Sequence, residues 1–311
     1  MRIINTEMKR IKVIIIVGPT SSGKSDLAVL VAKRFRGEVV SADSRQVYKG
    51  MDIGTGKITK KEMKGIPHHL LDVVSPKETF TVAKFKKLAE KTIKEINAKN
   101  KLPIICGGTG LYVDAFLYDW DIPKVSPKPE IRKSIQYKTT EELFKMLSGL
   151  DPARAATIDK NNKVRLVRAL EIVLATGAPV PSFKPFEKKN SPYEFIKIGI
   201  RTSNEELKSR IHTRLLKRLK QGMVSEVEKL HRQGVSWKRL DSFGLEYRWV
   251  SRYLRGLINE EEMIKTLEKE IWHYAKRQMT WFKRDKNTIW LNSPQKASRE
   301  VQDFLGREVL P

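Results

Sequence analysis

The sequence is poor in cysteine and has no long apolar run. Cys106 is the only cysteine among 311 residues, which excludes a disulfide framework and a cysteine-rich zinc site. A small buried thiol is the simplest role for it, and a reducing cytoplasm is the simplest compartment. The longest early apolar run, residues 13–17, is too short to cross a membrane or to form the centre of a signal peptide. We therefore expect a cytoplasmic protein that acts without a membrane.

Acidic residues are also scarce relative to basic ones. The chain has 36 Asp plus Glu against 61 Lys plus Arg, which gives a formal net charge of +25 and a pI near 10. Such an excess favours a polyanionic partner, and nucleic acid is the first candidate. The alternative is a basic surface that serves only solubility. Charge alone identifies no substrate.

Short β-branched runs alternate with longer helical patterns, which is typical of a parallel sheet flanked by helices. At 40% hydrophobic residues, the chain can bury a large core. Strands are predicted at residues 13–17, 38–41, 70–74, 103–106, 195–200 and 288–291. Helices are predicted at residues 26–35, 79–99 and 260–282, and a further helix opens at Ser203. We predict an α/β fold.

Residues 121–189 carry no convincing strand pattern. Proline-rich stretches at 123–129 and 179–185 bracket this segment. We therefore predict a small all-helical insertion domain at 121–189, placed within an α/β core made of residues 1–120 and 190–311.

A phosphate-binding pattern follows the first predicted strand. The pattern G-x-x-x-x-G-K-[ST] is matched by Gly18, Pro19, Thr20, Ser21, Ser22, Gly23, Lys24 and Ser25. In such a loop the backbone N–H groups converge on phosphate oxygens, the lysine adds a charge and the final hydroxyl can ligate magnesium. We predict a P-loop NTPase-like core that binds a phosphate or diphosphate. The pattern does not say which compound, since nucleotide kinases, hydrolases and other enzymes share it.

Asp43 follows the second predicted strand. Open α/β sheets bind their ligands at the carboxyl ends of their strands, so Asp43 can face the phosphate loop. Its position alone does not distinguish this role from that of a turn-forming aspartate. Residues 48–57 come next, with several glycines and too little apolar periodicity for a packed element. A loop of this kind is usually solvated or functional.

Two further segments offer polar groups to the same edge of the sheet. The fourth predicted strand ends in adjacent glycines, and Thr109 after them can cap a helix or contact substrate. Downstream, Arg210, Arg214 and Lys217 line one face of the helix that opens at Ser203. One of these arginines can reach the phosphates, although a basic helix face is more often solvated or bound to nucleic acid.

Six sequence blocks are distributed over nearly the whole chain, from residue 13 to about residue 285. They are GPTSSGKS, SADSRQVYKGMDIGTGK, PHHLLDVV, ICGGTGLY, RLVRALEI and AKRQMTWFKRD. Together they resemble the tRNA dimethylallyltransferase family, also called tRNA isopentenyltransferases. The resemblance implies Mg²⁺-dependent transfer of a dimethylallyl group from dimethylallyl diphosphate to the exocyclic N6 amine of adenosine-37, in tRNAs that read codons beginning with U. The partners we expect are this diphosphate and the tRNA anticodon stem-loop, bound by a monomer.

The resemblance also assigns roles to individual residues. It implies that Asp43 is the general base, that Thr20 and Ser25 are the phosphate-loop hydroxyls, and that Arg214 binds the diphosphate. Ser25 is also the hydroxyl that the phosphate-loop pattern offers to the metal. It further implies tRNA contacts for Asp43, Ser44, Arg45, Gln46, Thr109, Val164, Arg165, Leu166, Val167 and Arg168. The insertion matches the helical domain that clasps the anticodon stem-loop. All of this requires Asp43 and the phosphate loop to converge on one reacting carbon.

Two features depart from the family pattern, and two other functions stay open. Glu246 stands where the family more usually has glycine, which leaves the local turn uncertain, and the insertion is shorter than in many members. The first alternative is a nucleotide kinase or an adenylate isopentenyltransferase that acts on free nucleotides. The second is a non-catalytic RNA-binding protein that uses the phosphate loop as a nucleotide switch. The +25 charge and the blocks around Asp43 favour the tRNA enzyme.

Overall fold

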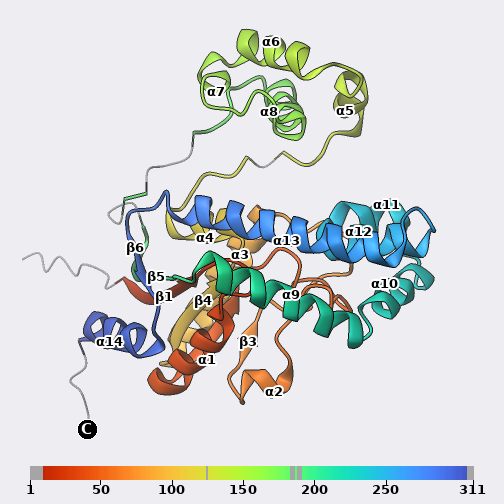
Figure 1. The fold of residues 1–311 in the computed structure, drawn as a ribbon. Coiled ribbons are helices and arrows are strands. Elements are labelled where there is room, and N and C mark those ends of the chain that lie inside the picture. The colour runs from red at the N-terminus through yellow and green to blue at the C-terminus, as the bar shows by residue number, and fades with distance from the viewer. Residues whose placement is uncertain (1–9, 124, 183–185, 188–190, 307–311) are drawn as a thin grey trace, which may run out of the picture. The chain divides into compact units, whose positions relative to one another are not determined.

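The structure is a computed structural model that describes residues 10–123, 125–182, 186–187 and 191–306. The chain divides into two compact units, one made of Met1–Asp119 with Phe186–Pro311 and one made of Trp120–Pro185 (Figure 1). These boundaries lie close to the expected insertion at 121–189, whose last residues, with 183–185 of the proline-rich stretch, fall outside the described residues. No described helix is long and apolar enough to cross a membrane.

Six parallel strands form the sheet of the larger unit, in the order β3-β2-β4-β1-β5-β6. The strands are β1 (Ile11–Val17), β2 (Gly37–Ser41), β3 (His68–His69), β4 (Leu102–Gly107), β5 (Tyr193–Ile200) and β6 (Thr288–Leu291). The predicted α/β fold is therefore confirmed. Val17 pairs with Gly107 and Ser41 with Cys106, so the carboxyl ends of β1, β4 and β2 lie level. The turns that follow these three strands meet at one edge of the sheet.

The third strand differs from its prediction at residues 70–74. It is His68–His69, which pairs with Val39 and Val40 of β2. Leu70 and Asp72 have φ angles of 61° and 55°, and this left-handed backbone cannot continue a strand. Val74 forms only an isolated bridge to Tyr48.

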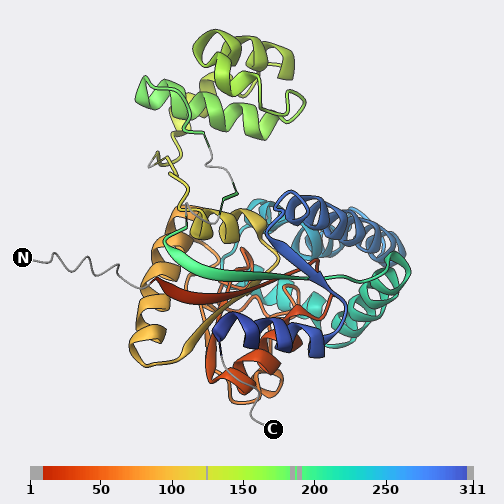
Figure 2. The same ribbon diagram turned by 90° about the vertical axis from the view of Figure 1, so that its left-hand side faces the viewer.

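Helices cover both faces of the sheet, which explains why β1 is apolar at nearly every position. α1 (Lys24–Phe35) and α14 (Pro294–Leu305) pack on one face, and α3 (Val82–Ala98) and α4 (Gly110–Leu117) pack on the other (Figures 1 and 2). The Thr81 hydroxyl caps the first turn of α3 by accepting a hydrogen bond from the Lys84 amide. The predicted helices at 26–35 and 79–99 are thus confirmed, with ends shifted by one to three residues.

Most of the remaining helices of this unit follow β5 in the chain. They are α9 (Asn204–Lys220), α10 (Met223–Arg232), α11 (Trp237–Phe243), α12 (Leu245–Leu254) and α13 (Glu260–Phe282), while the short α2 (Lys60–Met63) precedes β3. α13 spans the predicted residues 260–282, and the Ser203 hydroxyl caps α9 as predicted. The buried faces of α9 to α13 form one apolar cluster, which includes Leu215, Val227 and Leu267.

The loop at residues 48–57 is packed, although its sequence has too little apolar periodicity to predict a packed element; of the two possibilities, solvated or functional, the first does not hold. Tyr48 and Met51 are buried in the same apolar cluster as α9 to α13. The carboxylate of Glu226 in α10 accepts hydrogen bonds from the backbone amides of residues 52, 53 and 54, at 2.6 to 3.0 Å. Hydrogen bonds to a carboxylate are stronger than those between neutral groups, so these three bonds fix the loop to α10. This anchoring was not visible in the sequence, because Glu226 lies far downstream.

The smaller unit consists of helices alone among its described residues, as predicted. They are α5 (Pro129–Ile135), α6 (Thr140–Leu150), α7 (Pro152–Ala155) and α8 (Lys163–Thr176). Its apolar core contains Leu143, Leu147 and Leu170. Beside this core lies the fully buried carboxylate of Glu171, which accepts hydrogen bonds from Arg132, Arg168 and the Lys128 amide.

Candidate active site

The phosphate-loop sequence forms a tight turn between β1 and α1. Gly23 has a φ of 88°, in the left-handed region where glycine is preferred, and Ser21 shares that region at 64°. The turn leads directly into α1, whose first amides and dipole add positive potential. The Lys24 ammonium donates a hydrogen bond to the Pro19 carbonyl at 3.1 Å. The predicted residues Gly18 to Ser25 therefore form one loop at the carboxyl edge of the sheet.

A cleft of about 940 Å³ opens beside this loop. The cleft is lined by the phosphate loop, by residues between 52 and 59 and by α9. Its lining contains seven Lys or Arg residues and four Asp or Glu residues. Arg210 of α9 donates a hydrogen bond to the Ser22 carbonyl at 3.2 Å, and Arg214 lies 3.5 Å from the Ser21 hydroxyl. A cleft of this size with excess positive charge suits a diphosphate or a nucleotide.

Arg214 keeps its charge at neutral pH. The side chain is accessible to solvent through the cleft. The protein around it nevertheless displaces much of the water that would stabilise the charged form, and this desolvation lowers the pKa of Arg214. The neighbouring positive charge of Arg218 lowers it further. The resulting pKa of about 10 leaves the guanidinium protonated at pH 7. Arg214 is thus a permanent cation beside the phosphate loop, as its predicted role requires.

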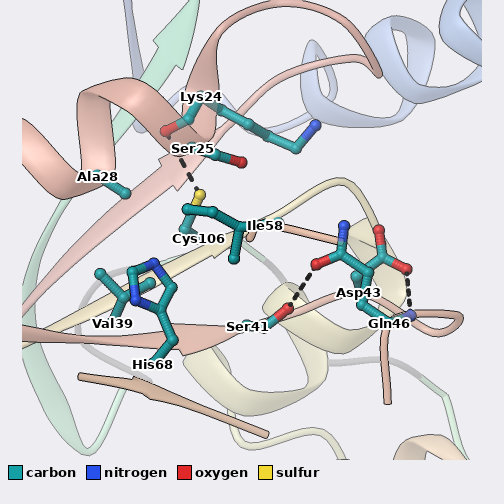
Figure 3. A pocket seen from close by; sticks show the side chains of 11 residues that line it. Lys24, Ser25, Ala28, Val39, Ser41, Asp43, Gln46, Ile58, His68 and Cys106 are labelled. Atoms are coloured by element: carbon teal, nitrogen blue, oxygen red, sulfur yellow. Dashed lines mark hydrogen bonds between the residues drawn. The ribbon is translucent and has the colours of Figure 1, made fainter. Parts of the chain in front are cut away.

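Asp43 and Lys24 line one cavity at the ends of β1, β2 and β4. Figure 3 shows both side chains extending toward the same end of this cavity, which Ser25, Ser41 and Gln46 also line. Lys24 and Ser25 line the larger cleft as well, so the two spaces adjoin. The cavity measures about 20 Å³, which holds one water molecule but neither a purine nor a prenyl group. The carboxylate of Asp43 and the phosphate-loop residue Lys24 therefore border the same small space, which is closed to larger groups by the side chains that line it.

The Asp43 carboxylate has one oxygen engaged in a turn. Its Oδ1 accepts hydrogen bonds from the backbone amides of Arg45 at 2.8 Å and Gln46 at 3.3 Å. Among the residues that the structure describes, no hydrogen bond uses Oδ2. Asp43 is thus a turn-forming aspartate and lines the cavity at the same time, so the two roles considered for it are compatible.

Thr109 holds the segment that carries Asp43. Its hydroxyl accepts a hydrogen bond from the Ser44 amide at 3.0 Å and does not cap α4. Glycine at position 107 allows the two turns to approach this closely, because a Cβ atom on Gly107 would lie 2.1 Å from the Ala42 carbonyl oxygen. Thr109 therefore positions the turn after β2, and its predicted contact with tRNA stays a prediction.

Gln278 of α13 is a site residue that the sequence did not reveal. Its side-chain oxygen accepts a hydrogen bond from the Thr20 amide at 2.8 Å, and its nitrogen donates one to the Gly108 carbonyl at 2.8 Å. A Cβ atom on Gly108 would lie 2.3 Å from that nitrogen. Gln278 thus ties the phosphate loop to the turn after β4. No local pattern signals this link, since Gln278 lies 258 residues downstream of Thr20 and 170 residues downstream of Gly108.

Arg45 and Gln46, both predicted to contact tRNA, already have partners within the protein. The Arg45 guanidinium donates to the Phe243 carbonyl at 2.8 Å, and the Gln46 amide donates to the Gly56 carbonyl at 3.4 Å. Both side chains are half-buried, with Asp43 and Ser44 beside them. Of these residues, Asp43 and Gln46 line the cavity.

The five predicted tRNA contacts in the insertion divide between the surface and the core. Val164 is 79% exposed and Arg165 is exposed, so both are accessible to RNA. Leu166 is fully buried in the core of the smaller unit, and its predicted contact with tRNA is wrong for the side chain. Val167 packs against that core, and Arg168 pairs with Glu171.

A magnesium ion finds few protein ligands at this site. Among the described residues, no group of three or more His, Cys, Asp or Glu side chains is placed to hold a metal. Ser25 offers a hydroxyl oxygen that lines both the cleft and the cavity. Mg²⁺ commonly takes one or two protein oxygens and completes its shell with substrate phosphates and water. The donor set therefore fits a magnesium ion that arrives with a diphosphate.

Comparison with known proteins agrees with this geometry. The model of the IPP transferase family matches residues 46–285. A protein named tRNA dimethylallyltransferase from Acetivibrio thermocellus is 42% identical over 93% of this chain and 94% of its own length. One of the same name from Caldanaerobacter subterraneus is 43% identical over 88% and 89%.

The fold is shared as well. The crystal structure of a full-length tRNA isopentenylpyrophosphate transferase from Bacillus halodurans is 38% identical to this chain and superposes with a TM-score of 0.71. The match covers 95% of each chain. Because the family model spans most of the chain, and relatives of this identity match it almost from end to end, the chain belongs to the IPP transferase family.

Proposed function

We propose that this protein transfers a dimethylallyl group from dimethylallyl diphosphate to the N6 amine of adenosine-37 in tRNAs that read codons beginning with U. One observation carries the proposal: Asp43 and the phosphate-loop lysine Lys24 line the same cavity in a chain whose relatives are named tRNA dimethylallyltransferases. The reaction requires a general base next to a diphosphate-binding loop, so that the amine and the allylic carbon are held together.

Asp43 acts on the nucleophile. The adenine N6 lone pair is delocalised into the ring, so the amine attacks carbon only if its proton is removed as the new bond forms. The Oδ2 atom of Asp43 takes that proton, while Oδ1 stays in the turn with the amides of Arg45 and Gln46. The turn holds the carboxylate in place, which reduces the reorganisation that proton transfer needs.

The phosphate loop and Arg214 act on the leaving group. As the bond between the allylic carbon and the diphosphate oxygen breaks, the electron pair stays with the diphosphate and its negative charge rises. Lys24, Arg214 and the loop amides stabilise that charge. Thr20 presents its hydroxyl at the same loop, with its amide fixed by Gln278. Mg²⁺, held by Ser25 and the diphosphate, supplies further charge neutralisation when bound.

The acceptor base must leave its stack to reach Asp43. A base inside an anticodon loop is shielded by its neighbours, so the enzyme flips it outward. The flipped adenine displaces the side chains that close the small cavity, with Gln46 and Ile58 among the residues that line it. The exposed Arg165 of α8 contacts the RNA backbone, as the family resemblance implies for the insertion.

Nucleoside mass spectrometry tests the proposal. The purified protein is incubated with dimethylallyl diphosphate, Mg²⁺ and tRNA that has adenosine at position 37, or with free AMP in place of tRNA. We expect one C5H8 unit on adenosine from tRNA and none on AMP. Prenylation of AMP with untouched tRNA would instead identify an adenylate isopentenyltransferase. Absence of any prenylated product would reject the proposal.

A further inference from the structure

A second arginine lies one helical turn beyond Arg214. Arg218 of α9 lines the same cleft as Lys24 and Arg214, and its side chain is only 11% exposed. Residues at i and i+4 of a helix project from the same face, so α9 presents both guanidinium groups to the phosphate loop.

The two guanidinium groups converge on the backbone of Gly56. A Cβ atom at that position would lie 1.9 Å from Nη2 of Arg218 and 3.1 Å from Nη2 of Arg214. Glycine at this place, with a φ of 57°, leaves room for both. Two like charges held this close repel one another, and they do so least when an anion lies between them.

Glu246 fixes one edge of Arg218. Its carboxylate accepts a hydrogen bond from Nη1 at 2.9 Å, and Nη1 also lies 3.5 Å from the Gly54 carbonyl. Within the described parts of the chain, no hydrogen bond uses Nε or Nη2 of Arg218. Those N–H groups are therefore available to a ligand, and the guanidinium cannot turn away from the cleft without losing its partner.

The local charges do not cancel. Glu246 is the carboxylate paired with Arg218, and no ion pair involves Arg214 among the described residues. Burial lowers the pKa of Lys24, the nearby Cys106 and Asp43 raise it, and the charges of Arg214 and Arg218 lower it, so the three cations lie within reach of one another's charge. A purely structural Arg–Glu pair would neutralise its surroundings. Here the surroundings stay positive.

We propose that Arg218 is a second diphosphate-binding arginine, and that Glu246 is the positioning residue that orients it. The inference rests on the proposed function only for the identity of the diphosphate, which is that of the allylic donor. It also explains Glu246, which otherwise departs from the family pattern without a purpose. Arg218 and Arg214 then bind the phosphates together from one helix face, opposite the loop amides.

Isothermal titration with inorganic pyrophosphate and Mg²⁺ tests this without tRNA or a prenyl group. The variants are Arg218→Met, which keeps the length of the side chain, and Glu246→Gln, which keeps an oxygen for Nη1. Arg232→Met is the matched control, because Arg232 pairs with Glu228 at 2.6 Å on the surface of α10, outside the cleft. Thermal unfolding of each variant is measured in parallel.

We expect Arg218→Met to raise the Kd for pyrophosphate about tenfold or more, the loss that one charge-assisted hydrogen bond predicts. Glu246→Gln removes a negative charge beside the anion, so its Kd should not rise by more than about threefold. The control should match the wild type. A folded Arg218→Met protein with wild-type affinity would overturn the proposal.

A double variant covers the case in which Arg218→Met does not fold. Arg218→Met with Glu246→Gln leaves no uncompensated buried charge. It too should bind pyrophosphate about tenfold more weakly, and wild-type affinity would overturn the proposal. The titration is independent of catalysis. A wild-type protein that binds pyrophosphate through Arg218 but prenylates no tRNA would refute the proposed function and leave this inference standing.

Discussion

Asp43 combines a structural and a chemical role in a single carboxylate. One oxygen completes the turn after β2 by accepting two backbone amides, and the other has no hydrogen bond among the described residues. A residue that is held by its own turn needs no further partner to aim it at substrate. For this reason the effect of substituting Asp43 on folding can be separated from its effect on catalysis.

Arg214 should control binding of the donor. We expect Arg214→Ala to raise the KM for dimethylallyl diphosphate by about tenfold or more and to lower kcat, because a cation beside the leaving group is lost. Arg214→Lys should recover only part of this, since lysine lacks the planar fork. Steady-state kinetics at fixed tRNA measure both effects. Unchanged KM and kcat in the alanine variant would contradict the role of Arg214.

Leu166 shows what a family motif does not reveal. The motif assigns a continuous run, Val164 to Arg168, to tRNA contact. In a helix, however, neighbouring residues point in different directions. Leu166, Ala169, Leu170 and Val173 face the core of the smaller unit, and the exposed face keeps Val164 and Arg165. The motif names the segment, and the helical period decides which of its side chains are exposed.

α13 connects the phosphate loop to the turn after β4 and to α4. Its Gln278 bridges the Thr20 amide and the Gly108 carbonyl, and its Trp281 donates a hydrogen bond to Asp114 of α4 at 2.6 Å. Only glycine fits at position 110, because a Cβ atom there would lie 2.1 Å from the Trp281 ring. The glycine-rich turn after β4 is therefore shaped by a helix distant in sequence.

Gln278→Met should separate this link from general packing. Methionine has a similar length but leaves the Thr20 amide and the Gly108 carbonyl without partners, at a cost of about 1–3 kcal/mol in the free energy of unfolding. We expect a higher KM for the donor as well, because the phosphate loop loses its fixed shape. Urea unfolding and donor kinetics measure the two effects. A loss of stability with unaltered donor kinetics would limit Gln278 to a structural role.

Glu171 should decide the stability of the helical insertion. The two arginine partners of Glu171 are 46% and 36% exposed, so losing their shared carboxylate should cost about 1–3 kcal/mol, and Glu171→Gln should increase hydrogen exchange in α5 and α8. The matched control is Glu141→Gln, on an exposed position of α6. Equal exchange in the two variants would show that the cluster contributes little.

The same cluster should respond to acid. Burial alone raises the pKa of Glu171, but hydrogen bonds from Arg132, the Lys128 amide and Arg168 outweigh it and lower the pKa to about 2. A pKa lowered by folding means that stability is complete above the ordinary value near 4.5 and is lost as the pH falls toward about 2. We expect the wild-type protein to lose protection of α8 from hydrogen exchange within this pH window. The Glu171→Gln variant should show no such pH-dependent loss.

The excess of basic residues gives the whole molecule a strong positive charge, which should govern how it binds tRNA. With a net charge of +25, binding of tRNA should release many counterions. We expect the affinity for tRNA to fall at least about tenfold between 50 and 200 mM salt, and Arg165→Ala to reduce the slope of log K against log salt by about 0.7 to 0.9. Fluorescence anisotropy with labelled tRNA measures both. A salt-independent affinity would mean that the charge serves only solubility.

The fold could be predicted where local chemistry determines it. Five of the six strands and the bounds of α13 follow from β-branched runs, helical periodicity and capping residues. The failures have two physical causes. The packed loop at 48–57 and the role of Gln278 depend on partners far along the chain, such as Glu226, which no local pattern specifies. The third strand was misplaced because the backbone at Leu70 and Asp72 is left-handed, which the apolar run at 70–74 does not signal.

The most direct measurement is the single-turnover rate of prenyl transfer by Asp43→Asn, with saturating tRNA and dimethylallyl diphosphate. Asparagine keeps an oxygen for the amides of Arg45 and Gln46, so the turn and both binding affinities should persist, as in an Asp303→Asn control on the exposed side of α14. If Asp43 and the phosphate loop act on one carbon centre, the rate should fall about 10²- to 10⁴-fold. A wild-type rate would show that another group removes the proton.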